Sequence, residues 1–226
     1  MPAQYNLPTI IDVIQDIAQE KGLATTTDTE MSTFINLALL QIRNDHEFSE
    51  LIESTDLSFT RSATNPYNTV SAPADFWEPI RLNNATDDYH FWYMEPHTLR
   101  DLRRADRFTY VDVESAFAKD GSNILIYHDI TETLTLYFYS KYLVLDNDGT
   151  TQKETPASAG VDADTFRIVN DNLIIYRTLM YMYEKEPDSH SDYIVVENVY
   201  KATLDAEKRL NPSQKLSRLE SLQFAG

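Results

Sequence analysis

The spacing of apolar residues changes twice along the chain and predicts helices at both ends with strands between them. Near the N-terminus, apolar residues recur every three or four positions, which is typical of an amphipathic helix. We expect this helix to begin near Thr9, with Thr9 as N-cap and Asp12 completing a capping box, and to stop at Gly22. A second helix should start around Asp28 and run antiparallel to the first, because the connection is short. The apolar faces of the two helices comprise Ile10, Ile14, Ile17, Met31, Phe34, Ile35, Ala38 and Ile42.

After Glu53 the period of the pattern falls to two, which is typical of half-buried strands. The clearest case runs from Thr133 to Tyr142, where apolar residues alternate with threonine and tyrosine. Pro73 should end an earlier strand at a corner, where Asp75 can accept backbone N–H bonds. An arginine-bearing helical segment is expected from Thr98 to Ala105. The other expected strands lie near residues 57–61, 69–72, 80–84, 90–94 and 123–128.

The helical period returns near the C-terminus. Pro187 should separate one helix from a second, which runs from about Ser191 to Leu210. Residues 146–163 lack apolar periodicity and are expected to form a flexible loop. Residues 213–226 can form a short amphipathic helix, but it has no obvious partner within the chain. The buried positions expected in the two helices are Phe166, Val169, Leu173, Tyr176, Met180, Tyr183, Val196, Val199, Tyr200 and Thr203.

These elements predict an α+β fold. The N- and C-terminal helix pairs should form a helical bundle from residues 1–54 and 164–212. Residues 55–145 should form an inserted antiparallel β domain with a short helix. A C-terminal extension, residues 213–226, completes the expected organisation.

The net charge of the chain is −17, from 19 Lys and Arg against 36 Asp and Glu. Binding of nucleic acid through its phosphates requires clustered cations, so this balance argues against a sequence-independent DNA-binding protein. One cluster exists, and helical spacing places its members on one face. It is interpreted either as a solvated face with local ion pairs or as a contact with an acidic surface of a neighbouring subunit. The cluster consists of Arg100, Arg103, Arg104 and Arg107.

Composition narrows the class of protein further. The 226 residues are enough for a well-buried core, and the absence of cysteine excludes disulfides and thiolate zinc sites. The first residues lack the basic and apolar regions of a signal peptide, and no segment has the length of a membrane span. We therefore expect a protein that is made in the cytoplasm and has no membrane partner.

Few residues indicate catalysis. His128 lies beside Asp129, but a single imidazole next to one carboxylate is common and carries little weight. Asp146 and Asp148 resemble the start of a calcium loop, yet Ala157 stands where that loop requires a bidentate glutamate. A pair of carboxylates suited to glycoside hydrolysis stays open, because such pairs form only in space. We assign no catalytic, cofactor-binding or metal-binding residue and expect that the protein is not an enzyme.

Aromatic side chains make up 12% of the chain. Within the runs Phe91–Tyr93 and Tyr137–Tyr139, alternate rings should face opposite sides of a sheet. One set can fill the core, and the other must meet solvent or a partner. Exposed rings and spare carboxylates leave a carbohydrate-active or sugar-binding module as an alternative function. A monomeric regulatory module is a third possibility.

The order of several short motifs resembles the head-to-tail adaptor, or connector, proteins of tailed bacteriophages. A helical pair is followed by the corner Ala72-Pro73-Ala74-Asp75-Phe76 and the strand Ile80-Arg81-Leu82. The segments Gly121–Tyr127 and Leu134–Tyr139 match the two strands of a hairpin in that family, although the proline common in its turn is absent. A terminal helical pair from Asp164 to Leu210 completes an order that covers nearly the whole chain.

The resemblance implies a structural virion protein, located in the neck between the capsid portal and the tail and made in the host cytoplasm. It would bind the portal protein as a homo-oligomeric, dodecameric ring and present a platform for tail or nozzle proteins. DNA would pass through the ring without specific binding, which suits a negative charge. The residues expected to contact the portal or a neighbouring subunit are Leu216, Leu219, Leu222 and Phe224 in the tail, with Arg100, Arg103, Arg104 and Arg107.

Overall fold

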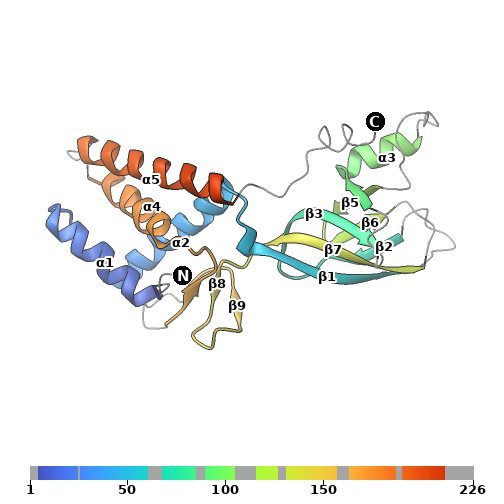
Figure 1. Cartoon of the computed structure of the whole chain (residues 1–226), viewed down its shortest axis with the longest axis horizontal. Coiled ribbons are helices and arrows are strands. Elements are labelled where there is room, and N and C mark those ends of the chain that lie inside the picture. The colour runs from blue at the N-terminus through green and yellow to red at the C-terminus, as the bar shows by residue number, and fades with distance from the viewer. Residues whose placement is uncertain are drawn as a thin grey trace. The chain divides into compact units, whose positions relative to one another are not determined.

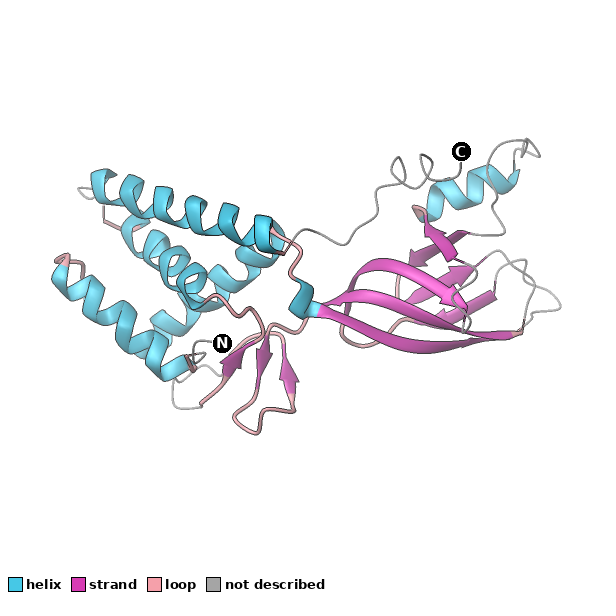
Figure 2. Cartoon of the chain, in the orientation of Figure 1, coloured by secondary structure: helices cyan, strands magenta, loops and turns pink. Residues whose placement is uncertain are grey.

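The chain divides into two compact units, one mainly helical and one built on a sheet (Figures 1 and 2). The structure, a computed structural model, describes residues 5–24, 26–60, 68–84, 90–104, 116–126, 131–156, 163–186 and 190–211. The helical unit contains residues 5–51 and 141–211, and the sheet unit contains residues 52–140. Within the described residues, the polypeptide therefore leaves the helical unit once and returns to it once.

Three helices of the helical unit are arranged around α4, which packs against each of them. Figure 1 shows α4 between α5 and α1, with α2 behind. Most side chains of α4 are buried, since it has neighbours on several sides. Burying each large aliphatic side chain contributes about 1.5–3 kcal/mol. The four helices are α1 (Leu7–Glu20), α2 (Asp28–Asp45), α4 (Asp171–Glu184) and α5 (His190–Leu210).

The starts of α1 and α2 follow different capping residues. Helix α2 begins at Asp28 as expected, because the Thr27 side chain accepts from the Glu30 backbone while the Glu30 carboxylate accepts from the Thr27 backbone. The expectation that Thr9 caps α1 is wrong. The helix begins at Leu7, and Asn6 is its N-cap, with Oδ1 accepting from the Thr9 N–H at 3.0 Å.

A small antiparallel sheet belongs to the helical unit, in the order β10-β8-β9. Its strands are β8 (Val144–Leu145), β9 (Gln152–Lys153) and β10 (Thr165–Phe166). The flexible loop expected over residues 146–163 contains the short strand β9, which the sequence did not indicate. Phe166 lies in a strand where a helix was expected. Lys153 Nζ donates to both carboxylate oxygens of the fully buried Asp164 at 2.9 and 2.8 Å, which holds the sheet together. Residues 157–162 of this segment lie outside the described residues.

The sheet unit is one seven-stranded sheet in the order β1-β7-β3-β4-β5-β6-β2. Its first and last strands, β1 and β2, contact each other, so the sheet is nearly closed. All pairs are antiparallel except β4 and β5, which are parallel and are connected through α3 (Pro96–Arg104). The strands are β1 (Ile52–Phe59), β2 (Asn68–Ser71), β3 (Phe76–Asn84), β4 (His90–Tyr93), β5 (Ala116–Asp120), β6 (Asn123–Ile126) and β7 (Glu132–Ser140).

The core of the sheet unit lies on the concave side of this curved sheet. Strand β7 lies between β1 and β3 and pairs with both. Phe138 of β7 stacks on Phe76 of β3 with ring centroids 5.5 Å apart. Around this pair, the buried apolar side chains are Leu57, Phe59, Leu82, Phe91, Phe117, Ile124, Ile126, Leu134 and Leu136.

The expected fold class, a helical bundle with an inserted antiparallel β domain and a C-terminal extension, is wrong. The chain is α+β, but the large, nearly closed sheet dominates it, beside five helices in the described residues. The sequence pattern underestimates the β content because β5, β8, β9 and β10 are short. A segment of two to five residues is too short to show the alternation of apolar and polar residues that distinguishes a strand from a loop. The parallel pairing of β4 and β5 also contradicts a purely antiparallel domain.

Two further expectations about the sheet are wrong. The strand matched by the hairpin motif at Asn123–Ile126 pairs with β2 and β5, whereas β7 pairs with β1 and β3. A hairpin between them is excluded because both edges of β7 are already occupied. The aromatic run on β7 does not alternate between core and solvent, because Phe138 and Tyr139 are both buried. The run on β4 does alternate, with Phe91 buried and Trp92 40% exposed.

Candidate functional site

Helix α5 carries the largest set of exposed apolar side chains in the described part of the chain. Val195 is 60% exposed, Val199 38% and Leu210 77%. Ala202 and Ala206 lie between them, so the spacing is three or four residues throughout and places all five on one side of α5. We call these five residues the α5 face. Large exposed apolar patches on a protein surface mark interaction sites.

The rotation of α5 about its axis is fixed by Tyr200. This side chain is buried against the bundle, and its hydroxyl donates to Asp45 Oδ2 of α2 at 2.7 Å. Burial and the neighbouring Asp45 carboxylate raise the pKa of Tyr200 well above its ordinary value, so the hydroxyl keeps its proton. The expectation that Val199 is buried beside Tyr200 is wrong, because adjacent helical residues point about 100° apart.

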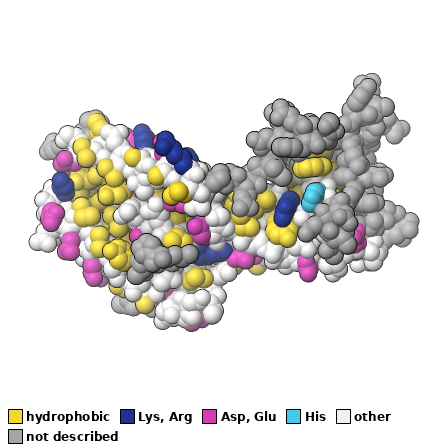
Figure 3. All heavy atoms as spheres, viewed as in Figure 1, with side chains coloured by type: hydrophobic (Ala, Val, Ile, Leu, Met, Phe, Trp, Pro, Cys, Tyr) yellow, Lys and Arg dark blue, Asp and Glu magenta, His cyan; other side chains and the backbone are white. Residues whose placement is uncertain are grey.

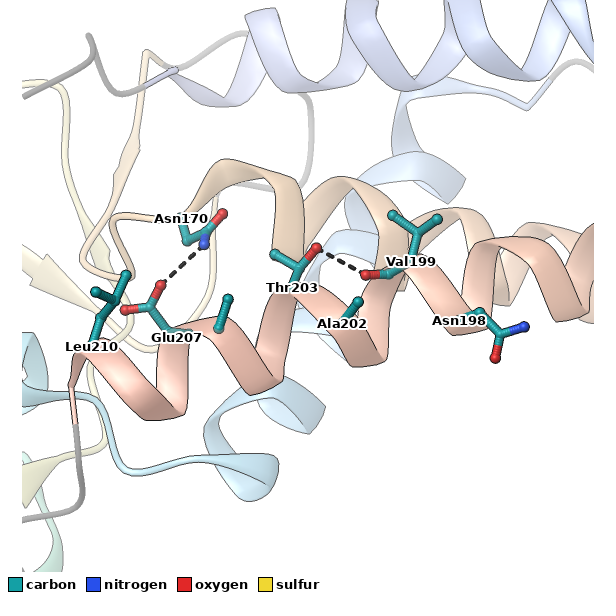
Figure 4. Close-up of a pocket in the computed structure, with 8 residues that line it drawn as sticks. Asn170, Asn198, Val199, Ala202, Thr203, Glu207 and Leu210 are labelled. Carbon is teal, nitrogen blue, oxygen red and sulfur yellow. Dashed lines mark hydrogen bonds between the residues drawn. The ribbon is translucent and has the colours of Figure 1, made fainter.

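A groove runs along the α5 face and ends near the start of α4 (Figure 4). Its volume is about 540 Å³. Three of the four polar side chains that line it are bonded within the chain: Thr203 Oγ1 donates to the Val199 carbonyl at 2.8 Å, and Glu207 accepts from Asn170 Nδ2 at 3.0 Å. An occupant would therefore meet mainly apolar surface. The residues that line the groove are Asn170, Asn198, Val199, Ala202, Thr203, Ala206, Glu207 and Leu210.

A second groove of about 500 Å³ adjoins the first and shares Asn170, Glu207 and Leu210 with it. It extends the hollow surface from α5 to Tyr5 and Val169, which are 42% and 39% exposed. Exposed apolar side chains thus continue from one groove into the next. In Figure 3, apolar side chains gather over the helical unit on the face toward the viewer.

Of the site residues expected from the sequence, Arg100 is the one whose side chain the structure describes. Arg100 of α3 forms an ion pair with Asp120 of β5, and both side chains are nearly half exposed. This agrees with local ion pairing at Arg100, and a contact with a neighbouring subunit stays a prediction. The side chains of Arg103 and Arg104, and all of Arg107, lie outside the described residues, as do Leu216, Leu219, Leu222 and Phe224.

The described residues give little support for a metal site, a calcium loop or a membrane-spanning helix. Within them, no three His, Asp or Glu side chains gather in a way that could hold a metal ion. Asp148 is used to close a turn, because its carboxylate accepts from the Thr150 and Thr151 backbones and from the Thr151 hydroxyl. These bonds lower the pKa of Asp148 far below its ordinary value. Among the described helices, none is long and apolar enough to cross a bilayer.

His46 lies where the ends of α2 and α5 meet. Its ring is buried edge-on against Phe48, with centroids 4.7 Å apart, and Nε2 has no hydrogen-bond partner in the described residues. Burial lowers the pKa of His46 most strongly, and Lys208 lowers it further. A bond to the Asn211 backbone and the carboxylates of Glu207 and Glu47 oppose this shift.

We expect the helical unit to lose stability when the pH falls through the pKa of His46. The folded pKa lies below the ordinary value of 6.5, so the stabilisation is complete above about pH 6.5 and is lost as the pH falls through the folded value. Urea unfolding at about pH 7.5 and about pH 5 should give a larger drop for the native chain than for His46→Gln. His97→Gln, at an exposed position, is the control. Equal drops for all three proteins would contradict the role of His46.

The sequence profile of the SU10 adaptor protein family matches residues 5–218. The chain belongs to this family. The match includes both units and every helix and strand described above. No curated protein matches the chain. The resemblance to phage head-to-tail adaptors is confirmed, and with it a structural role as an adaptor of a bacteriophage. In such a role, the exposed α5 face is a candidate for contact with another protein.

Proposed function

We propose that this SU10-family adaptor forms a dodecameric ring on the portal, in the neck of the virion, and presents a platform for tail or nozzle proteins. The observation that carries the proposal is the family match over residues 5–218. The exposed apolar α5 face supports it, because a protein that works alone seldom leaves such a surface uncovered. The ring would assemble from chains made in the host cytoplasm.

The charge of the chain supports a ring through which DNA passes. A net charge of −17 leaves few cations that could bind phosphates. Of the described cations, Arg100 is paired with Asp120, and Lys153 with Asp146 and Asp164. A ring of such subunits would repel DNA and let it slide.

The C-terminal tail is proposed as the segment that docks into the portal. Residues 213–226 carry Leu216, Leu219, Leu222 and Phe224 at near-helical spacing. A segment that orders on its partner can cover a large surface, at an ordering cost of about 2–5 kcal/mol. Arg103, Arg104 and Arg107 are proposed as a second contact, with the portal or with a neighbouring subunit.

Deletion of residues 213–226 should abolish attachment to the portal protein of the same phage and leave the fold intact. Attachment is measured by co-sedimentation with assembled portal, and the fold by circular dichroism and urea unfolding. Replacing Leu216, Leu219, Leu222 and Phe224 with serine should have the same effect, because the apolar side chains provide the contact. The matched control replaces Gln214, Ser217, Ser221 and Gln223 with alanine. Attachment of the truncated chain at native levels would rule out the tail as the docking segment.

A further inference from the structure

The α5 face ends where the chain leaves the helix. Leu210 is the last residue of both, and its side chain is 77% exposed. Asn211 follows, and its N–H donates to the Glu207 carbonyl at 2.8 Å, which completes the last turn. Pro212 cannot continue a helix, so we expect the chain to change direction beside Leu210. The next residues are therefore tethered at one end of an uncovered apolar surface, which Figure 4 shows from Leu210 to Val199.

The segment after Pro212 matches this surface in pattern and length. Three of its leucines are spaced by three residues, so helical geometry places them on one side. In helical conformation, residues 213–224 and residues 199–210 each span about 17 Å. Antiparallel helices are commonly joined by about two to five residues, so a helix that turned back at Asn211 and Pro212 would run along the α5 face. The leucines are Leu216, Leu219 and Leu222.

Charges beside the α5 face also favour this segment. Lys215 and Arg218 of the segment lie three residues apart, on one edge of the leucine stripe. In an antiparallel arrangement they reach the second half of α5, where Asp205 and Glu207 stand on opposite edges of the face. Each edge therefore offers a carboxylate to these cations, and complementary charges favour the correct partner and orientation. The charged residues that border the face are mainly acidic: Asp192, Asp205 and Glu207, with Arg209.

We propose that residues 213–224 fold back as a helix on the α5 face of the same chain in the free subunit, and leave this face when the portal binds them. The three leucines would lie along the apolar row from Leu210 to Val199. The tether makes the contact intramolecular, at an effective concentration of about millimolar, so the chain's own tail precedes that of a second copy. The docking is argued from the α5 face itself, whereas the release to the portal rests on the proposed function.

The docked tail would control when subunits associate. In the free chain, the leucines and the α5 face would cover each other, and two apolar surfaces would be withdrawn from water together. The burial of three leucines has to offset the ordering of about a dozen residues, so the balance is close and a competing surface can take the tail. The portal would then remove the tail and at the same time uncover the α5 face for a neighbouring subunit. Assembly of the ring would thus begin on the portal.

Cysteine modification tests whether the tail covers the face, because the chain has no cysteine of its own. The variant Val199→Cys is treated with a maleimide in the full-length free chain and in the chain that lacks residues 213–226. A tail that is docked about nine-tenths of the time should slow modification about tenfold, and its deletion should remove the protection. Lys201→Cys is the matched control, because Lys201 is exposed and points about 160° away from Val199 on the same helix.

Two results of this measurement would overturn the proposal. One is an equal rate at Val199→Cys in the full-length and shortened chains, or protection of the same size at Lys201→Cys. The other is protection that disappears on dilution, because it would assign the face to the tail of a second copy. Protection that does not change on dilution supports the intramolecular contact.

A disulfide shows where on α5 the tail lies. In the antiparallel arrangement Val199 and Gln223 stand opposite each other, and helical spacing places Gln223 on the leucine side of the tail. Oxidation of Val199→Cys/Gln223→Cys with copper–phenanthroline should therefore give a cross-linked monomer, which migrates faster on a non-reducing gel. Lys201→Cys/Gln223→Cys has nearly the same tether and should react about ten times more slowly. Equal rates, or covalent dimers in place of the monomer, would overturn the proposal.

The same disulfide separates this inference from the proposed function. The oxidised Val199→Cys/Gln223→Cys chain should not co-sediment with the portal protein of the same phage, because its tail is held on α5, and dithiothreitol should restore attachment. Attachment of the oxidised chain at native levels would overturn the release. Attachment that requires the tail, without protection of Val199→Cys in the free chain, would reject the docking and leave the proposed function standing. Protection in a chain whose attachment does not need the tail would reject the proposed portal contact and retain the docking.

Discussion

Arg167→Ala will destabilise the helical unit by roughly 2–4 kcal/mol. The Arg167 guanidinium donates from Nη2 to the Glu50 carbonyl at 2.8 Å and from Nη1 to the Tyr142 carbonyl at 3.3 Å and to Gln152 Oε1 at 3.2 Å. Glu50 stands just before the chain leaves the unit, and Tyr142 just after it returns. The Arg167 side chain therefore binds both the segment just before the chain leaves the helical unit and the segment just after it returns. Alanine leaves the Glu50 and Tyr142 carbonyls without their charged donor.

Urea unfolding followed by far-ultraviolet circular dichroism measures this effect, because most helical residues belong to this unit. Arg167→Lys should fall between the native chain and the alanine variant, since an ammonium keeps the charge but cannot bridge three acceptors in the same fork. Lys21→Ala, at an exposed position after α1, should change the free energy of unfolding by less than about 0.5 kcal/mol. An unchanged urea midpoint for Arg167→Ala would show that other contacts hold the segments at Glu50 and Tyr142 in place.

Phe138→Ala will destabilise the sheet unit by about 3–5 kcal/mol. Phe138 is 2% exposed, stacks on Phe76 and stands on β7, which pairs with β1 and β3, so alanine creates a cavity in the core. The cost includes both the lost burial of the ring and the contacts that its neighbours lose. Phe138→Leu fills most of the space and should cost clearly less.

Tryptophan fluorescence measures this second effect selectively. The chain has two tryptophans, Trp77 and Trp92, and both lie in the sheet unit. In urea, Phe138→Ala should shift the fluorescence transition more than the helical signal, and Arg167→Ala should do the reverse. Thr133→Ala, at an exposed position of β7, is the control. Equal shifts of both signals in both variants would show that the units unfold as one.

The sequence predicts elements well where a local signal is strong. The Thr27 and Glu30 pair marks the start of α2 because each side chain bonds the backbone of the other. The alternation from Thr133 to Phe138 marks β7 because one face of the strand is buried. At the start of α1, Asn6 and Thr9 are both good capping residues, and the competition between them is decided by bonds that a sequence does not show.

The parts that escaped prediction depend on contacts between distant residues. Strands of two residues, such as β8, exist because their partners are brought beside them, and no local period marks them. The exposed position of Val199 follows from the bond between Tyr200 and Asp45, which are far apart in the sequence. The α5 face was missed for this reason, although Val195, Ala202 and Ala206 stand in the sequence at helical spacing. The helical spacing of these three residues is the signal from which the α5 face could have been predicted.

The late positions of β7 and α4 in the sequence have a consequence for how the chain acquires its fold during synthesis. Residue Ile52 of β1 pairs with Tyr139 of β7, and α1 and α2 pack on α4, which begins at Asp171. In each unit, an element on which earlier ones pack is therefore made late. We expect the early segments to leave the ribosome without their partners, the sheet core to close only after β7 is made, and the helical core to close only near the end of translation. Such long-range pairing is slow, so the newly made subunit should remain open to chaperones for longer than a protein with local contacts.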